Sequence, residues 1–119
     1  MIKDNIQTVL EGILDSYSPV VNSDDLPQTP FCIHETKISE TLRDKSGIYG
    51  YEYDLGVMIV GDSETQIDPM VEMVIDTLEM TIDDDIDEIR FTTMSGLQYD
   101  QDSNKFHNQL NFKCTTNKL

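Results

Sequence analysis

The stretch from Ile48 to Gly61, IYGYEYDLGVMIVG, constrains the fold more than any other part of the chain. From Tyr49 to Ile59, every second residue is tyrosine or aliphatic, so these residues share one side of an extended chain. A period of two is the pattern of a β-strand with one buried face, so we predict a long strand that turns this side toward the core. Gly50 and Gly56, on the other side, indicate bulges or a close approach of another backbone. The predicted core side comprises Tyr49, Tyr51, Tyr53, Leu55, Val57 and Ile59.

The start of the chain predicts an amphipathic helix. Apolar residues recur there at spacings of three and four, and polar residues fill the positions between them. Pro19 marks the end of this helix or the start of the next connection. The apolar stripe comprises Ile2, Ile6, Val9, Leu10, Ile13, Leu14 and Tyr17.

A second helix is expected after the long strand. Ser63 and Gln66 have the spacing of a capping box, in which the side chain of each residue accepts a hydrogen bond from the backbone N–H of the other. Pro69 fits the first turn of this helix only if the helix begins a few residues later than the box suggests. The helix is expected to end near Met80, and its apolar face comprises Ile67, Met70, Val71, Val74, Ile75 and Leu78.

Three further stretches alternate in the same way as the long strand and predict strands. The charged run DDDIDE predicts a turn before the second of them, and DQDSN predicts a hairpin turn before the third. The three strands are expected at residues 31–38, 89–99 and 106–115.

Two loops and a tail are expected between and after these elements. Residues 18–30 contain three prolines among small polar residues, and residues 39–47 read SETLRDKSG, so both segments predict loops. Residues 115–119 are expected to fray.

The order of elements predicts the fold class. A helix, two strands, a helix and two strands, in the order α-β-β-α-β-β, indicate an α+β fold. We expect a four-stranded, mainly antiparallel sheet with two helices packed on one face. The chain of 119 residues is expected to form one α+β domain, residues 1–119.

Charge excludes several classes of function. Eight Lys and Arg residues oppose 23 Asp and Glu residues, which gives a formal net charge of −15. Nucleic acid and anionic membranes are held by clustered cations, so neither is an expected ligand. No stretch has the roughly 18 apolar residues of a membrane span, and the acidic N-terminus does not resemble a signal peptide.

The acids are concentrated in one region. Between Asp62 and Glu88 there are 11 acids and no Lys or Arg. This region predicts a negative face on the second helix and the turn after it. The face is either ordinary solvated surface, a docking site for a basic protein, or a surface that repels nucleic acid.

No catalytic, cofactor or metal site is expected. Cys32 and Cys114 are interpreted as buried reduced thiols. A zinc site would instead need the two cysteines and His34 on the same face of adjacent strands. His34 and His107 lie in ordinary strand alternation without a nucleophile motif, which favours a non-enzymatic protein. The run from Asp100 lacks the glycine and glutamate of a calcium loop, and weak calcium binding at residues 83–88 is a lesser alternative to a solvated turn.

Several local motifs, together with the element order, resemble one protein family. A proline-rich loop ends in Gln28-Thr29-Pro30-Phe31-Cys32-Ile33, a long strand with tyrosines follows at residues 49–60, and Asp62-Ser63-Glu64 lead into the second helix. A hairpin of residues 89–99 and 105–115 closes the chain. In these features the chain resembles the tail-completion or tail-terminator proteins of long-tailed bacteriophages, which are small α+β proteins that form a ring on the tail tube.

This resemblance implies a structural virion protein that is made in the bacterial host cytoplasm and sits in the tail near the neck. Its implied partners are itself in a homo-oligomeric ring, a hexamer by resemblance, together with the tail tube protein and the head-tail connector. DNA would pass through without specific binding. The alternative class is a small acidic protein that binds a basic host protein as a DNA mimic or inhibitor.

We expect the ring contacts to join basic residues in and beside the 39–47 segment to the acidic region of the next subunit. The candidate interface residues are Lys37, Leu42, Arg43, Lys45, Asp83, Asp84, Asp85, Asp87 and Glu88.

Overall fold

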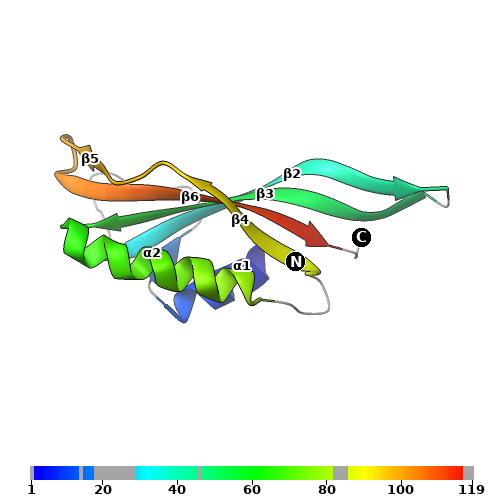
Figure 1. The fold of residues 1–119 in the computed structure, drawn as a ribbon, viewed down its shortest axis with the longest axis horizontal. Helices are drawn as coiled ribbons and strands as arrows, with labels where there is room; N and C mark the ends of the chain where they lie inside the picture. The colour runs from blue at the N-terminus through cyan, green and yellow to red at the C-terminus, as the bar shows by residue number, and fades with distance from the viewer. Residues whose placement is uncertain (1, 14, 18–28, 46, 82–85, 117–119) are drawn as a thin grey trace.

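The computed structural model describes residues 2–13, 15–17, 29–45, 47–81 and 86–116. It confirms the α+β class, with two helices and six strands (Figure 1). The elements are α1 (Ile2–Glu11), β1 (Asp15–Tyr17), β2 (Phe31–Asp44), β3 (Gly47–Gly61), α2 (Glu64–Glu79), β4 (Glu88–Met94), β5 (Gln98–Asp100) and β6 (Lys105–Thr116).

The strands form one mainly antiparallel sheet in the order β1-β2-β3-β6-β4, with β5 also paired to β6. β4 and β5 occupy the same edge of β6, because β3 takes the other edge. β1 and β2 are parallel, and every other pair is antiparallel. Alternation along the chain shows where strands lie but not how they pair. It therefore predicted neither the parallel pair β1–β2 nor the two strands on one edge of β6.

The predicted count of four strands is therefore wrong. Asp15–Tyr17 form the short strand β1 beside Phe31–Ile33. The stretch expected as one strand at residues 89–99 is two strands, because the ladder with β6 is interrupted at residues 95–97. Gly96 has a φ of 83° there, a backbone conformation that glycine adopts without steric cost.

Both helices pack on the same face of the sheet, as expected (Figure 1). Across the sheet, Val57 of β3 pairs with His34 of β2 and with Leu110 of β6, so these side chains share the helix-facing side. On the predicted core side of β3, Leu55, Val57 and Ile59 are buried as expected, whereas Tyr51 and Tyr53 are only half-buried. The core also includes Ile6 and Leu10 from α1 and Ile67, Val74 and Leu78 from α2, all fully buried.

α1 is shorter than predicted. It ends at Glu11, and Tyr17 lies in β1 instead of on the helix stripe. Gly12 follows the last helical residue, and glycine costs a helix about 1 kcal/mol relative to alanine. Two turn hydrogen bonds, from Gly12 N to Val9 O and from Ile13 N to Leu10 O, close the end of the helix.

α2 begins where the capping box places it. Ser63 is the N-cap, and its hydroxyl accepts a hydrogen bond from Gln66 N at 3.3 Å. Gln66 Oε1 accepts from the backbone N–H of Asp62, at 2.6 Å, one residue before the N–H of the standard box. Pro69 consequently lies inside the helix, on its exposed side, so the later start that Pro69 suggested is wrong. The predicted end is confirmed, since Met80 is the C-cap.

The predicted loop at residues 39–47 is wrong. β2 continues to Asp44 and pairs with β3 down to Asp44↔Gly47, with register irregularities at Ile38/Glu40 and Leu42/Arg43. Pairing between β6 and β3 starts only at Tyr51. Residues 39–44 and 47–50 therefore form a two-stranded arm that extends past the rest of the sheet (Figure 1). We call these residues, with Lys45, the hairpin arm.

The remaining boundary predictions are settled in part. The turn before β6 is confirmed at residues 101–104. The tail does not fray at Thr115 and Thr116, because β6 includes both and Thr116 is 4% exposed. Residues 18–28 of the first predicted loop, residues 83–85 and residues 117–119 lie outside the described residues.

Candidate interaction surfaces

The hairpin arm is the first candidate surface. It projects along the longest dimension of a molecule measuring 52 × 26 × 23 Å (Figure 1). A two-stranded ribbon is marginally stable on its own, because it has no third strand or helix to bury a face against. Arg43 and Lys45 are exposed on the arm, and Ile38 at its base is 52% exposed. The arm thus presents backbone, cations and apolar surface together.

The outer edge of β2 is part of the same surface. β1 pairs with only Phe31–Ile33. Within the described ranges, β2 has no strand beside its outer edge from His34 to Asp44. A long open edge offers backbone N–H and C=O groups to a strand of another chain. The geometry therefore suits strand addition by a neighbour.

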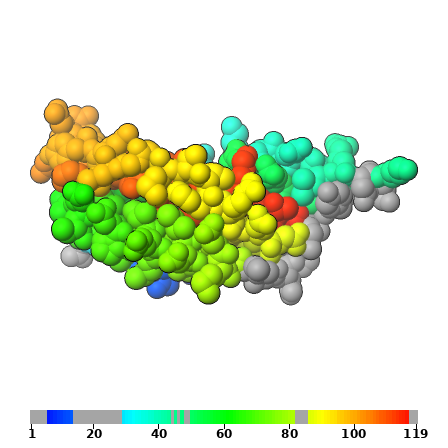
Figure 2. Space-filling model, in the orientation of Figure 1, coloured from blue at the N-terminus to red at the C-terminus, as the bar shows by residue number. Residues whose placement is uncertain are grey.

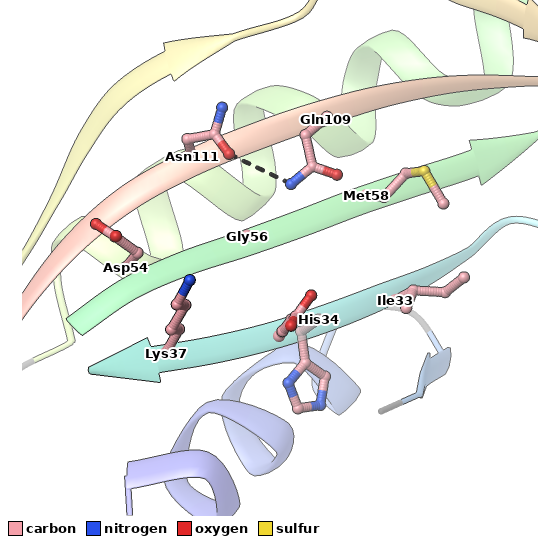
Figure 3. A pocket seen from close by; sticks show the side chains of 9 residues that line it. Ile33, His34, Lys37, Asp54, Gly56, Met58, Gln109 and Asn111 are labelled. Atoms are coloured by element: carbon pink, nitrogen blue, oxygen red, sulfur yellow. Dashed lines mark hydrogen bonds between the residues drawn. The ribbon is translucent and has the colours of Figure 1, made fainter. Parts of the chain in front are cut away.

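A polar groove on the helix-free face of the sheet is the second candidate surface. It has a volume of about 510 Å³ and lies over Gly56, between Lys37 and Asp54 on one side and Gln109 and Asn111 on the other (Figure 3). Gln109 Nε2 donates to Asn111 Oδ1 at 3.3 Å. The lining is thus polar and carries charges of both signs, Lys37 beside Glu35 and Asp54.

Lys113 is paired with two acids at the edge of this face. Its Nζ lies 2.5 Å from Asp54 Oδ1 and 3.3 Å from Glu52 Oε1. The hydrogen bond to Asp54, followed by that to Glu52, raises the pKa of Lys113 above its ordinary value. Two carboxylates surround this cation, so Lys113 has little capacity left to bind a phosphate.

The outer side of α2 is the third candidate surface, and it is acidic. No Lys or Arg lies in the helix. One of its acids has a structural role, since Glu79 Oε2 accepts from Phe91 N on the edge of β4 at 3.1 Å. The exposed acids of the helix are Glu64, Asp68, Glu72, Asp76 and Glu79.

Asp62, just before α2, is committed to holding the structure together. Its carboxylate accepts hydrogen bonds from Lys105 Nζ of β6 and, at 2.6 Å, from Thr29 Oγ1. The bond from Lys105, and then that from Thr29, lowers the pKa of Asp62 below its ordinary value of 3.8. Asp62 thus joins the end of β3 to the start of β6 and to the residues before β2.

The structure places the described members of the predicted interface in three separate locations. Lys37 lines the polar groove, whereas Leu42, Arg43 and Lys45 lie in the hairpin arm. Asp87 and Glu88 are exposed at the start of β4. Asp83, Asp84 and Asp85 lie outside the described residues.

The described acids of the predicted acidic region extend from the start of α2 to the start of β4. Glu88 pairs with Thr115, which pairs with Glu52, so Glu88 lies at the end of the sheet from which the arm projects. Asp68 lies in the first half of α2 and Glu72 at its middle, and α2 begins at the opposite end of the molecule (Figure 1). Asp68 and Glu72 are therefore distant from Glu88, whereas Glu79, near the end of α2, contacts β4 through Phe91 N.

The histidines and cysteines lie where ordinary strand alternation puts them. His34 is fully buried, points toward α1 and hydrogen-bonds Gln7 Oε1 through Nε2 (Figure 3). Cys32 and Cys114 are both buried and form no disulfide, which confirms the interpretation as buried thiols. In the part of the chain that the structure describes, no three His, Cys, Asp or Glu side chains are grouped as metal ligands.

Sequence reasoning missed the amide-bearing residues Asn108, Gln109 and Asn111. Gln109 and Asn111 line the groove, and Asn108 points to the helix side. Their signal is a run of amides inside a strand that otherwise alternates apolar and polar residues.

Neither described helix is long and apolar enough to cross a membrane.

Comparison with known proteins gives a fold relationship. No protein-family model and no curated protein sequence matches the chain. Among solved structures, a chain of the virion of a native gene transfer agent particle is similar to this protein, with a TM-score of 0.65 and 13% sequence identity. The similarity covers 93% of this chain and 83% of that chain. At this identity, it shows that the two chains share a fold.

Proposed function

We propose that the protein is a structural subunit of a phage-like virion. The observation that carries this proposal is the fold shared, over 93% of the chain, with a chain of a gene transfer agent virion. The projecting hairpin arm and the open edge of β2 support it, because both are surfaces that an assembled particle can cover.

Within the virion, the proposed role is that of a tail-terminator or tail-completion subunit. Copies would close a homo-oligomeric ring, a hexamer, that caps the tail tube and contacts the head-tail connector. Heterologous, head-to-tail contacts close into rings when the rotation between copies allows it. The resemblance of the 28–33 and 49–60 motifs to tail-terminator proteins supports this assignment, as does an arm at one end of an elongated subunit.

The polar helix-free face is the proposed lining of the DNA passage. A passage wall must not trap phosphates, and its cations should therefore be neutralised locally. Lys113 between Asp54 and Glu52 fits this requirement. DNA would then pass without specific binding.

Native mass spectrometry with negative-stain imaging, at low and moderate salt, tests the ring. Closed rings of one defined number, which also bind the tail-tube protein of the same virus in a pull-down, are the expected result. A chain that stays monomeric and does not bind the tube would contradict the proposal.

A second candidate function follows from the acidic side of α2. An elongated molecule with regularly spaced exposed carboxylates could occupy the nucleic-acid site of a basic host protein. This candidate predicts a monomer or dimer and a tight, salt-sensitive complex with a basic enzyme. Capture of such an enzyme by a persistent monomer would favour it over the virion role.

A further inference from the structure

A second cavity lies between α2 and the strands β4 and β6. Its volume is about 590 Å³, and it is open to solvent. α2 and β4 lie side by side on the face of the molecule seen in Figure 2. The cavity is lined by Asp68, Pro69, Val71, Glu72, Met94 and Asn108.

Two carboxylates stand at this cavity without a cation. Asp68 and Glu72 are four residues apart in α2, so they lie on the same side of the helix, one turn from each other. Among the described residues, no ion pair involves either of them. Both are exposed, so a cation from outside can approach them.

The side chain of Asn108 leaves hydrogen-bonding capacity unused at the same cavity. Asn108 is 5% exposed, and its Oδ1 has no hydrogen-bond partner in the described structure. Its Nδ2 contacts Met94 Sδ at 3.8 Å, and a thioether is a weak acceptor. A rotation of the amide by 180° exchanges its two polar atoms, so the oxygen can be turned toward Met94 and the cavity. A buried amide oxygen without a partner is stabilised when a donor reaches it.

The ligand that fits this combination is an arginine side chain. A guanidinium group has five N–H donors in a fixed fork, enough to bond two carboxylates and an amide oxygen together. The aliphatic stem of the arginine can pack on Pro69, Val71 and Met94. A hydrated divalent cation would gain nothing from that apolar wall.

The chain itself offers an arginine that fits. It has two arginines, Arg43 and Arg90. Arg90 is also exposed, but it lies within β4, paired in register with Lys113, and not on a projecting part of the molecule. Arg43 is exposed on the hairpin arm, and none of the ion pairs among the described residues includes it.

Arg43 cannot reach the cavity of its own chain. The arm projects from one end of the molecule, whereas α2 begins at the other end (Figure 1). We infer that Arg43 of one copy inserts into the cavity of the next copy, where Asp68, Glu72 and Asn108 bind its guanidinium group. This inference rests on the proposed ring and names its contact, which is heterologous, as ring closure requires.

Charge swapping at the two positions tests the contact. The association of the wild-type chain, Arg43→Glu, Glu72→Arg and the double variant is measured by sedimentation velocity and native mass spectrometry at low salt. Each single variant is expected to weaken association by about tenfold or more, because like charges then meet in the cavity. The double variant, and an equimolar mixture of the two single variants, should restore association.

Two matched variants control for general charge effects. Arg90→Glu makes the same charge change in β4, outside the arm, and Asp76→Arg makes it in α2 away from the cavity. Both should leave association within about threefold of the wild type. All four positions are exposed, and circular dichroism confirms that each variant is folded.

The outcomes separate this inference from the proposed function. Wild-type rings that tolerate Arg43→Glu, or a loss that the double variant does not restore, would overturn the contact and leave the ring role standing. A wild-type chain that neither self-associates nor assembles on the tail tube would overturn both.

Discussion

Gln109 of β6 lies directly over Gly56 of β3. A Cβ atom at position 56 would stand 2.7 Å from Gln109 Nε2, which is closer than such contacts allow. The absence of a side chain at Gly56 therefore creates the floor of the polar groove and lets Gln109 reach Asn111. A glycine that looked like a bulge signal in the sequence shapes a surface instead.

Gly56 and Gly61 should respond differently to alanine. At Gly56 the obstacle is the mobile end of Gln109, so Gly56→Ala is expected to cost less than about 1 kcal/mol. At Gly61 a Cβ would lie 2.8 Å from Cγ1 of the fully buried Ile67, so Gly61→Ala is expected to cost about 1–3 kcal/mol. Urea unfolding of both variants measures the difference in the free energy of unfolding. Equal losses would show that the core around Ile67 rearranges to accept the added methyl group.

The hydrogen bond between Gln7 and His34 should stabilise the docking of α1. Gln7→Ala removes a bond to a fully buried imidazole, so we expect a loss of about 1–3 kcal/mol in the free energy of unfolding. Glu11→Ala is the control, because it removes the exposed bond between Gln7 and Glu11 on the same helix. Chemical denaturation compares the two, and a control as costly as Gln7→Ala would point to helix propensity as the cause.

Asp62 should make stability depend on pH in the acid range. The pKa of Asp62 is lowered in the folded state. Its carboxylate therefore stabilises the fold at pH values above the ordinary pKa of 3.8, and this stabilisation is lost as the pH falls through the folded pKa. Asp62→Asn should therefore be less stable than the wild type at pH 7, and the two should converge as the pH drops below about 4. Urea unfolding between pH 7 and pH 2.5 measures the convergence.

The ion pair of Asp62 is exposed to solvent, so salt should reduce the same difference at pH 7. Glu64→Gln is the control, because Glu64 is a neighbouring carboxylate that takes part in no ion pair among the described residues. A difference between wild type and Asp62→Asn that stays constant over the whole pH range would contradict the role of the Asp62 carboxylate.

The hairpin arm should be dispensable for folding and necessary for assembly. Thr41 and Tyr51 are register partners, so residues 42–50 can be replaced with a two-residue Asn-Gly turn. We expect the melting temperature to change by only a few degrees, because in the described chain the arm pairs with itself alone and adds nothing to the core. Native mass spectrometry should show loss of the ring.

A chain that keeps its ring without the arm would place the subunit contact elsewhere. A chain that unfolds would show that the arm stabilises the monomer, against the expectation. A useful comparison is the variant Lys45→Ala, which alters the tip but keeps both strands of the arm.

Periodic segments were predictable because their pattern is local. The alternation in β3 required one buried face, and the register with His34 and Leu110 confirms which face it is. Ser63 capped α2 as its spacing with Gln66 indicated. The hairpin arm was missed because its side chains are mostly exposed or half-buried, so no buried face imposes a period on residues 39–44.

By itself, the sequence determined the α+β class, the core faces of the strands, the cap of α2 and an acidic surface with few cations, since these depend on neighbours along the chain. Only the tertiary structure decided that β4 and β5 share one edge of β6, that Asp68 and Glu72 are separated from Asp87 and Glu88, and that Asn108 lines a cavity beside α2. These features depend on pairing between residues far apart in the chain. Many pairings satisfy the same local pattern, and the packing of the whole core selects one of them.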